Sequence, residues 1–361
     1  MGYFKSIDLI NFRNFENYSV SFSKNCNVFY GKNGAGKTNI LEGISLLAKG
    51  RGIRKDKYSN IIKQNCEKFI IKSDFKSEEI IYNLIAETEN INNRIKKKLS
   101  VNNDKSSDSH ELIYDKTPFL YFLPETERLF QSSPSIRRNL IDQFIYTSHN
   151  KYNKLVNRYN RLIQERSKIL INNNSDESWL NQLEKTISSD ALQIYSLRQS
   201  QIKILSNNLN IYLRDFNLPF KIEATLIDKY YNSKFSNQAY EDKLKDSRKI
   251  DALVGGCGIG PHKSDYIFYL NNKSFVSQLS TGQQKTIILL IYLSQCKYLS
   301  EVRLKQPILL LDEVCSHLDE VNRGVLMTLI QTFKLQIFMT GSSKNLFSFL
   351  STKANFCNII D

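Results

Sequence analysis

The feature that most constrains this 361-residue chain is a glycine-rich octapeptide between an apolar segment and a segment with helical periodicity. The octapeptide consists of Gly31, Lys32, Asn33, Gly34, Ala35, Gly36, Lys37 and Thr38. Residues 27–30 predict a buried strand before it, and residues 38–47 predict a helix after it. Glycines let the backbone close around an anion, and a helix N-terminus favours negative charge. The octapeptide is therefore predicted to bind nucleotide phosphates, with Lys37 on the outer phosphates and the Thr38 hydroxyl on Mg²⁺.

A second segment, residues 308–313, predicts an apolar strand that ends in two carboxylates. Asp312 and Glu313 follow the run from Ile308 to Leu311 directly. Mg²⁺ requires hard oxygen ligands, and a water that attacks phosphorus requires a base. Asp312 is therefore the predicted metal ligand. Glu313 is the predicted catalytic base, and Lys37 of the octapeptide is the second predicted catalytic residue. The alternative for such a segment alone is that the acids end the strand simply to meet solvent.

A third segment, residues 279–284, offers another helix N-terminus to a phosphate. Ser280 and Gly282 precede a strongly apolar helix predicted over residues 286–293. A single chain already has one phosphate loop, so a second phosphate-facing helix start has no obvious ligand within the same copy. By itself, however, Ser-x-Gly before a helix is also a common capped start.

Taken together, the three segments resemble those of ABC-type ATPases, and the whole chain resembles the RecF family of bacterial recombination repair, in the structural-maintenance and Rad50 branch. Further segments that carry the resemblance are 11–15, 122–125, 133–138, 260–265, 316–319 and 340–341. The resemblance implies an α/β fold, with an ABC-type P-loop ATPase head and an inserted α-helical lobe formed by an antiparallel helical arm. It also implies that Ser280 and Gly282 address the γ-phosphate of ATP held by a second copy, in an ATP-dependent homodimer.

The resemblance further implies an ATP-dependent DNA-binding protein with weak, DNA-stimulated ATP hydrolysis. Members of the family act on gapped or junction DNA with RecR and RecO, help to load RecA, and support replication restart and the SOS response. One alternative is the ATPase subunit of a transporter, which Thr340 opposes because transporter ATPases carry a switch histidine there. The other is a non-hydrolysing ATP-gated DNA clamp, which would not need Glu313 as a base.

The net charge of +14 favours a polyanionic partner, although abundant Lys, Asn, Ile and Tyr are also what A/T-rich coding DNA would produce. Local basic clusters are more informative, and they lie at residues 49–57, 94–98 and 137–138. The predicted DNA contacts are Arg51, Arg54, Lys96, Lys97 and Lys98. The alternative for each cluster is an ordinary solvated face.

No segment of the sequence predicts a membrane partner or a metal-binding cysteine motif. No apolar run approaches the ~18 residues that span a bilayer, and no secretory signal is evident. The six cysteines are scattered without a Cys-x-x-Cys pair, so they are expected to be reduced, largely buried thiols. The sequence therefore predicts a soluble, cytoplasmic protein.

Periodicity predicts three parts: an N-terminal part of the head over 1–130, a helical lobe over 131–250 and a C-terminal part of the head over 251–361. Strands are expected at 4–9, 18–22, 69–72 and 80–84, with a hairpin around 101–104. Helical spacing begins at Ser135, and a polar turn over 172–176 should join two long antiparallel helices. The polar stretch 230–249 is expected to be a mobile return crossing.

Overall fold

The computed structural model describes residues 2–48, 50–92, 94–172, 177–231, 235–316, 319–333 and 335–360. The chain forms two compact units, unit 1 from Met1–Glu127 with Lys285–Asp361 and unit 2 from Arg128–Gln284. The division of the head and lobe at 130 and 250 stays a prediction. The first boundary lies close to that of the compact units, whereas residues 251–284 group with the helical unit in the structure.

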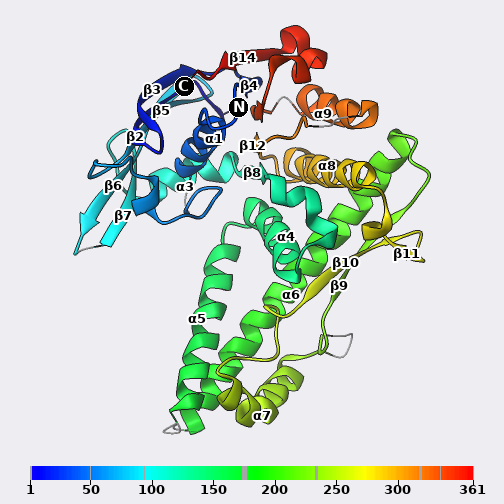
Figure 1. Ribbon diagram of the computed structural model, residues 1–361. Helices are drawn as coiled ribbons and strands as arrows, with labels where there is room; N and C mark the ends of the chain where they lie inside the picture. The colour runs from blue at the N-terminus through cyan, green and yellow to red at the C-terminus, as the bar shows by residue number, and fades with distance from the viewer. Residues whose placement is uncertain are drawn as a thin grey trace. The chain divides into compact units, whose positions relative to one another are not determined.

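Unit 1 contains a five-stranded parallel sheet with the order β14-β4-β13-β12-β8. Its strands are β4 (Cys26–Tyr30), β8 (Phe119–Phe122), β12 (Ile308–Leu311), β13 (Ile337–Gly341) and β14 (Ala354–Asn358). Every residue of β12 and β13 is buried, as in parallel sheets that are covered on both faces. Helix α1 (Lys37–Leu46) follows β4, so the glycine-rich loop and Asp312 both lie at the carboxyl edge of this sheet (Figure 1).

A six-stranded antiparallel sheet forms the other layer of unit 1. It consists of β1 (Gly2–Phe4), β2 (Ser6–Phe12), β3 (Phe15–Ser21), β5 (Ile70–Ser77), β6 (Ile80–Ile91) and β7 (Arg94–Val101). The strand predicted over 4–9 is divided, because β1 and β2 pair with different stretches of β5. The predicted strand over 80–84 continues to Ile91, where β6 pairs with β7, and residues 101–104 form a tight turn at the end of β7.

Helix α1 packs against β2 of the antiparallel sheet and β13 of the parallel sheet, and these contacts form part of one apolar core of unit 1. Ile40, Leu41 and Ile44 of α1 are fully buried with Leu9 and Ile71 of the sheet. The other helices of the unit are α2 (Tyr58–Ile61), α3 (Ser107–Lys116) and α9 (Glu320–Thr332). Helix α8 (Thr281–Lys297) begins at the end of unit 2, and a π-helical turn (Tyr298–Val302) follows it. Short 3₁₀ segments cover Pro124–Gln131, Val276–Gln278 and Lys344–Lys353.

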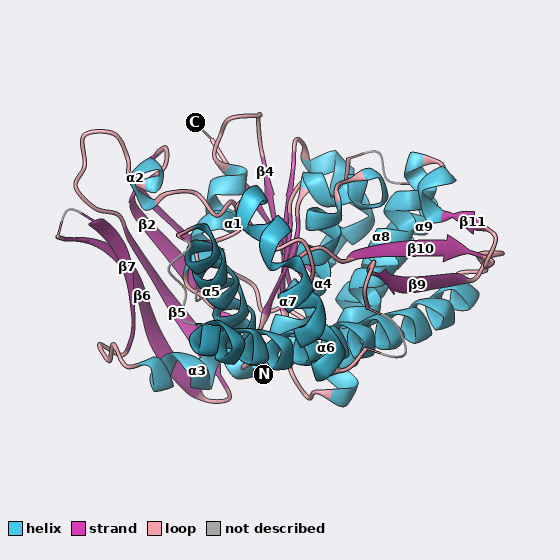
Figure 2. Ribbon diagram, turned by 90° about the horizontal axis from the view of Figure 1, so that it is seen from below, coloured by secondary structure: helices cyan, strands magenta, loops and turns pink. Residues whose placement is uncertain are grey.

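Unit 2 is mainly helical. Its elements are α4 (Pro134–Ser148), α5 (Tyr152–Ile171), α6 (Glu177–Asp215), α7 (Asn237–Val254), β9 (Ile222–Ile227), β10 (Asp265–Leu270) and β11 (Ser274–Phe275). Helices α5 and α6 run antiparallel side by side, which confirms the predicted hairpin, although residues 173–176 of its turn lie outside the described part of the chain. Strands β9 and β10 pair beside α6 (Figure 2).

The expectation of a mobile crossing over 230–249 is wrong for most of that stretch, because α7 occupies it from Asn237 onward. The Ser236 hydroxyl caps this helix by accepting a hydrogen bond from the Ala239 N–H at 3.1 Å. Tyr240 and Leu244, four residues apart, are buried. The polar composition of this stretch does not predict a helix, because only one narrow face of α7 is apolar. Residues 232–234 lie outside the described chain.

Candidate nucleotide site

The glycine-rich loop has a backbone path that only glycine can follow. Gly31, Gly34 and Gly36 have φ values of 153°, 93° and 97°, in the region that L side chains rarely adopt. A Cβ on Gly31 would lie 2.4 Å from the Ile359 carbonyl oxygen, and one on Gly36 would lie 2.6 Å from the Phe15 ring. The loop therefore turns tightly between β4 and α1 without side chains in its path.

The first turn of α1 is left without a side-chain cap, because Gly36 is the N-cap residue. The first N–H groups of a helix have no partner within the helix, so an uncapped first turn suits an anion. Lys37 is buried, and its ammonium donates to the carbonyls of Gly31 at 2.8 Å and Lys32 at 2.7 Å. The positive charge therefore lies across the loop, where an incoming phosphate could replace the two carbonyls.

Thr38 and Asp312, which are 274 residues apart in the sequence, come together at the carboxyl edge of the parallel sheet. The Thr38 hydroxyl lies 3.0 Å and 3.1 Å from the two carboxylate oxygens of Asp312. A hydroxyl and a carboxylate are the oxygen ligands that Mg²⁺ takes when phosphates supply further ligands. Among the described residues no group of three or more His, Cys, Asp or Glu could hold a metal alone. The pair therefore fits a Mg²⁺ shared with nucleotide phosphates.

Thr340 is a site residue whose role the sequence left open. Its hydroxyl donates to Asp312 Oδ1 at 2.6 Å and accepts from the Glu313 N–H at 2.8 Å. Thr340 is fully buried at the end of β13, which lies next to β12. One hydroxyl therefore fixes the orientation of the carboxylate and of the backbone that carries the neighbouring acid.

Glu313 has a backbone φ of 52°, in the left-handed region, and its side chain is exposed. Such a conformation costs on the order of 1–3 kcal/mol for a residue other than glycine, and it recurs at active sites. The Ser316 hydroxyl donates to the Glu313 carbonyl at 2.8 Å, which helps to hold the turn. His317 and Leu318, in the segment that carries part of the family resemblance, lie outside the described residues.

The start of α8 forms a reciprocal cap. The Ser280 hydroxyl accepts from the Gln283 N–H at 3.3 Å, and Gln283 Oε1 accepts from the Ser280 N–H at 3.1 Å. Gln284 is buried and donates to the carbonyls of Ser277 and Leu279. A Cβ on Gly282 would meet no described atom within 4 Å, so this side of the turn is open. The role of Ser280 and Gly282 toward ATP of a second copy stays a prediction.

The predicted DNA-binding residues differ in their surroundings. Lys97 donates to the carbonyls of Leu46 and Ala48 at the end of α1, each at 2.7 Å, and burial lowers its pKa to about 7. Lys98 pairs with Glu89, and Arg54 pairs with Glu42 at 3.3 Å. Arg51 and Lys96 are exposed.

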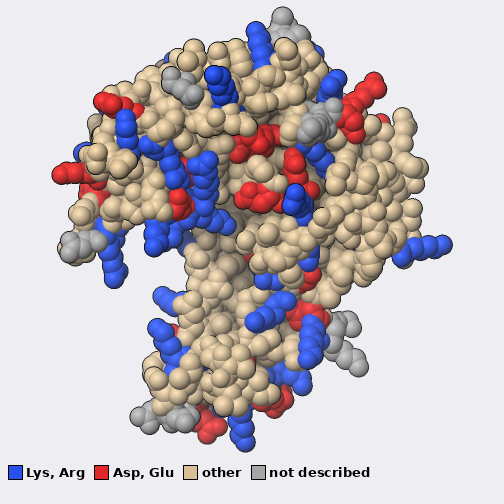
Figure 3. Space-filling model, in the orientation of Figure 1, with Lys and Arg blue, Asp and Glu red and all other residues tan. Residues whose placement is uncertain are grey.

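Lys and Arg side chains gather over this part of unit 1 (Figure 3). A hollow of about 610 Å³ there is lined by Arg51, Lys97, Lys98, Lys105 and His110, among others. Lys49, at the start of the predicted cluster 49–57, lies outside the described residues. In unit 2, Arg137 forms a bidentate pair with Asp265, with both distances 2.8 Å. One of the two arginines of the third basic cluster, residues 137–138, is therefore already paired with a carboxylate of the same unit.

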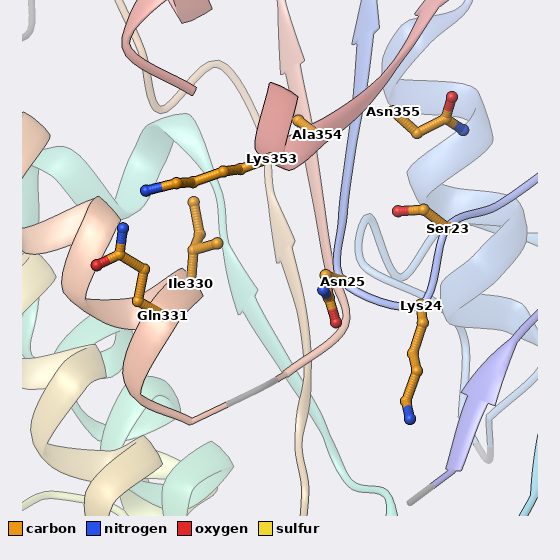
Figure 4. Close-up of a pocket in the computed structure, with 8 residues that line it drawn as sticks. All are labelled: Ser23, Lys24, Asn25, Ile330, Gln331, Lys353, Ala354 and Asn355. Carbon is orange, nitrogen blue, oxygen red and sulfur yellow. The ribbon is translucent and has the colours of Figure 1, made fainter. Parts of the chain in front are cut away.

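A second hollow, of about 550 Å³, lies at the amino ends of β4 and β14 and therefore at the edge of the sheet away from the phosphate loop. Its lining residues, shown in Figure 4, are Ser23, Lys24, Asn25, Ile330, Gln331, Lys353, Ala354 and Asn355. The Lys353 side chain extends toward Gln331 in this view. No residue predicted to contact nucleotide lines this hollow, so it is separate from the candidate nucleotide site.

The segment 260–265, which carries much of the resemblance, forms part of the interior of unit 2. His262 lies between the Tyr159 hydroxyl, 2.8 Å from Nδ1, and the Cys257 carbonyl, 2.9 Å from Nε2. Burial lowers the pKa of His262, which favours the neutral ring, and a neutral ring can donate from Nε2 to the carbonyl and accept at Nδ1 from the hydroxyl. Gly260 has a φ of 123°, and a Cβ there would lie 2.2 Å from the Tyr240 hydroxyl. These residues therefore stabilise the lobe.

The chain belongs to the family described as RecF/RecN/SMC N terminal domain, whose model matches residues 3–356. It is similar to the DNA replication and repair protein RecF of Rickettsia conorii, with 29% identity over 352 residues and 97% of each chain covered. The RecF of Rickettsia akari is 30% identical over 346 residues, with 94% of each chain covered. These matches confirm the resemblance to RecF and favour DNA repair over the transporter alternative.

Solved structures give the same result. The chain is similar to an ATP-bound RecF described as a recombination mediator protein of the RecFOR pathway, with a TM-score of 0.82, 26% identity, and 95% of this chain and 92% of that chain covered. An Smc head domain from Pyrococcus furiosus has a TM-score of 0.54 at 16% identity, with 97% and 92% covered, and shares the fold alone. The predicted α/β ABC-type ATPase head is therefore confirmed. Among the described residues, no helix is long and apolar enough to span a bilayer.

Proposed function

We propose that this chain is an ATP-dependent DNA-binding protein of recombinational repair and replication restart. The observation that carries the proposal is the approach of the Thr38 hydroxyl to the Asp312 carboxylate, at 3.0 Å and 3.1 Å, directly behind a glycine loop with an uncapped helix. Such an arrangement provides both a phosphate cradle and oxygen ligands for a shared Mg²⁺. ATP is the nucleotide of the solved RecF relative.

Each site residue has a distinct role in this proposal. The backbone of residues 31–38 binds the phosphates, while Lys37 leaves the carbonyls of Gly31 and Lys32 to neutralise the outer phosphates. Thr38 and Asp312 would hold Mg²⁺, which neutralises charge on the phosphates when bound. Glu313 accepts a proton from the attacking water, so that ATP is hydrolysed to ADP and phosphate.

The proposal includes an ATP-dependent homodimer. A second copy would place its Ser280 and Gly282 against the γ-phosphate, at the helix start that the open side of Gly282 leaves accessible. ADP lacks that phosphate, so it should not support the same assembly. Slow hydrolysis would then release the dimer from DNA.

The proposed DNA surface consists of Arg51 and Lys96, which are exposed, with Lys98 and Arg54 available if they leave their carboxylate partners. Lys97 is left out because its amine is buried against two carbonyls of α1. RecR and RecO are proposed partners, in keeping with the RecFOR pathway named for the solved relative. Help in loading RecA, support of the SOS response and weak stimulation of hydrolysis by DNA complete the proposal.

The decisive experiment measures retention of the full chain on gapped DNA, intact duplex and single strands, with ATP, with ADP and without nucleotide. The proposal expects retention that requires ATP and Mg²⁺ and that is strongest on gapped DNA. Lys37→Ala serves as the nucleotide-binding control and should reduce retention to the level without nucleotide. Equal retention with and without ATP would contradict the proposal.

A further inference from the structure

Unit 1 contains a cavity of about 430 Å³ that none of the functions above uses. Its lining comes from β1, β5, the β5–β6 turn, β6, the end of α3, and the segment after α8. The lining residues are Gly2, Phe75, Ser77, Glu78, Tyr82, Ile113, Thr117, Ser300, Leu304 and Gln306. The phosphate loop, the acidic strand end and the basic surface contribute no residue to it.

Two of the lining residues have a buried polar atom that is not hydrogen-bonded. Ser300 Oγ and Gln306 Oε1 are inaccessible to solvent and have no hydrogen-bond partner among the described residues. Buried polar atoms are nearly always paired, so two such atoms beside one cavity indicate a partner from outside the chain, which the two side chains can meet by turning toward the cavity. The amide oxygen of Gln306 can only accept, and Ser300 can accept as well as donate. The missing partner therefore has to supply N–H or O–H groups.

The charge at the cavity points in the same direction. Glu78 is the one charged residue among those that line it, and the side chain has only acceptor oxygens when ionised. The Thr117 hydroxyl already donates to the Ile113 carbonyl at 2.6 Å, so this group also offers an acceptor to the cavity. A ligand with amide N–H groups and a positive charge suits these acceptors. A phosphate-bearing ligand would meet only like charge.

Exposed apolar side chains extend the surface beyond the cavity. Leu304 is 83% exposed, and its φ of 53° holds a bulky side chain in the left-handed region. Val302 is 67% exposed within the same segment, and Ile80 is 55% exposed opposite Ser77, which lines the cavity. A small molecule inside the cavity would leave these three side chains in water. A polypeptide lying over the cavity would cover them.

We propose that this cavity is the docking site for a polypeptide segment of a partner protein. The segment inserts an apolar side chain beside Phe75 and Leu304, donates backbone hydrogen bonds to Ser300 and Gln306 as these side chains turn toward the cavity, and places a basic side chain against Glu78. It combines the apolar anchor with the charge complementarity that fixes orientation at interfaces. The site differs from the proposed DNA surface in the sign of its charge, so the two can be occupied independently.

The first test uses two sets of fluorescent, acetylated and amidated hexapeptides with the full-length chain. One set carries Leu, Phe or Trp next to Arg in a Gly/Ser background, and the matched set carries Asp in place of Arg. Fluorescence anisotropy should detect binding of the basic set, with the acidic set at least about tenfold weaker. If no basic peptide binds, or if both sets bind equally, the proposal is wrong.

The second test uses variants chosen for their backbone conformation. Leu304→Asn and Glu78→Asn remove the apolar anchor and the carboxylate at two positions with φ values of 53° and 57°, which Asn tolerates well. Both should weaken the best basic peptide about tenfold, whereas Ile360→Asn, at an 81% exposed position outside the cavity, should leave affinity unchanged. ATP binding should match wild type in all three variants, which shows that each one folds.

Two outcomes would overturn the proposal at this stage. One is unchanged peptide affinity in Leu304→Asn. The other is a self-associated wild-type species, seen in sedimentation without peptide, that Leu304→Asn removes. The second outcome would assign the surface to another copy of this chain.

Discussion

Helices α1 and α8 are both predicted to direct their first turn at a phosphate, yet their first turns are built differently. Gly36 begins α1 without any side-chain cap. Ser280 begins α8 with a reciprocal cap, in which its own hydroxyl and the Gln283 side chain each satisfy one backbone N–H. The first turn of α1 is therefore open to an anion, whereas α8 already supplies its own acceptors.

The difference suggests an order of events. Glycine at an N-cap costs a helix only about a few tenths of a kcal/mol, and it leaves the first N–H groups without a side-chain acceptor, so these groups of α1 are available to a ligand from the start. The Ser280 hydroxyl, in contrast, donates to Gln283 Oε1 at 3.2 Å, and this O–H has to turn away from Gln283 before it can donate to a γ-phosphate. Nucleotide should therefore bind at α1 of each copy first, and α8 of another copy should engage it afterwards.

The largest expected effect is on binding at α1. Lys37→Ala removes the buried ammonium from the loop, and ATP affinity should fall about 100-fold, because a charge-assisted hydrogen bond contributes about 1.5–3 kcal/mol. Lys24→Ala, an exposed position at the opposite edge of the parallel sheet, is the control and should bind ATP like wild type. Equilibrium binding of a fluorescent ATP analogue checks both, and equal affinity of wild type and Lys37→Ala would remove Lys37 from the site.

The next effect concerns hydrolysis without a change in binding. Glu313→Gln keeps the size of the side chain and removes the base, so the hydrolysis rate should fall about 10²–10⁴-fold while ATP affinity is retained. Glu320→Gln, an exposed acid on α9, should hydrolyse normally. Phosphate release measured over time tests the pair. A normal rate in Glu313→Gln would place the base elsewhere.

Substitutions at Ser280 test the role of α8 directly. Ser280→Arg should abolish the ATP-dependent dimer and its hydrolysis, yet leave one ATP bound per monomer. Ser280→Gly separates the two uses of the hydroxyl, because glycine at an N-cap costs only about a few tenths of a kcal/mol in helix stability. In Ser280→Gly, light scattering with ATP and Mg²⁺ should therefore show a weakened dimer. Thermal unfolding of the same variant should show an unchanged melting temperature. A wild-type dimer in both variants would disprove action across subunits.

The smallest effect is expected at the basic surface. Joint charge reversal of Arg51 and Lys96 should reduce the slope of log affinity for DNA against log salt by about 2, since each phosphate contact contributes about 0.9. Lys97→Met should leave that slope unchanged and lower the melting temperature, because the end of α1 loses its two hydrogen bonds. An unchanged slope after charge reversal would return Arg51 and Lys96 to the status of a solvated face.

The parts of the site that could be predicted are those encoded by neighbouring residues. The glycine loop and the pair of carboxylates can each be recognised within eight consecutive residues, because phosphate and metal binding at these segments depends on the local backbone shape. Thr340 could not be given a role, since its bonds to Asp312 and Glu313 depend on β13 lying next to β12. Sequence alone does not give that order of strands.

Two other features of the structure have a signal in the sequence. Lys96, Lys97 and Lys98 are consecutive residues of β7, and alternate residues of a strand face opposite sides. The alternation directs Lys97 toward α1, away from the side of Lys96 and Lys98. Similarly, Ser236 followed by Tyr240 and Leu244 has the spacing of a capped amphipathic helix, which the polar composition of the stretch obscured.

The amine of Lys97 links β7 to the end of helix α1. Helix α1 is about 15 Å long, and the phosphate loop lies at its start. At its end, Lys97 of β7 donates two hydrogen bonds to the carbonyls of Leu46 and Ala48. Lys96 and Lys98 are the neighbours of Lys97 in the same strand. If DNA binds Lys96 and Lys98 as proposed, a displacement of β7 would pass through the Lys97 hydrogen bonds to α1 and from there to the phosphate loop, without direct contact between DNA and ATP.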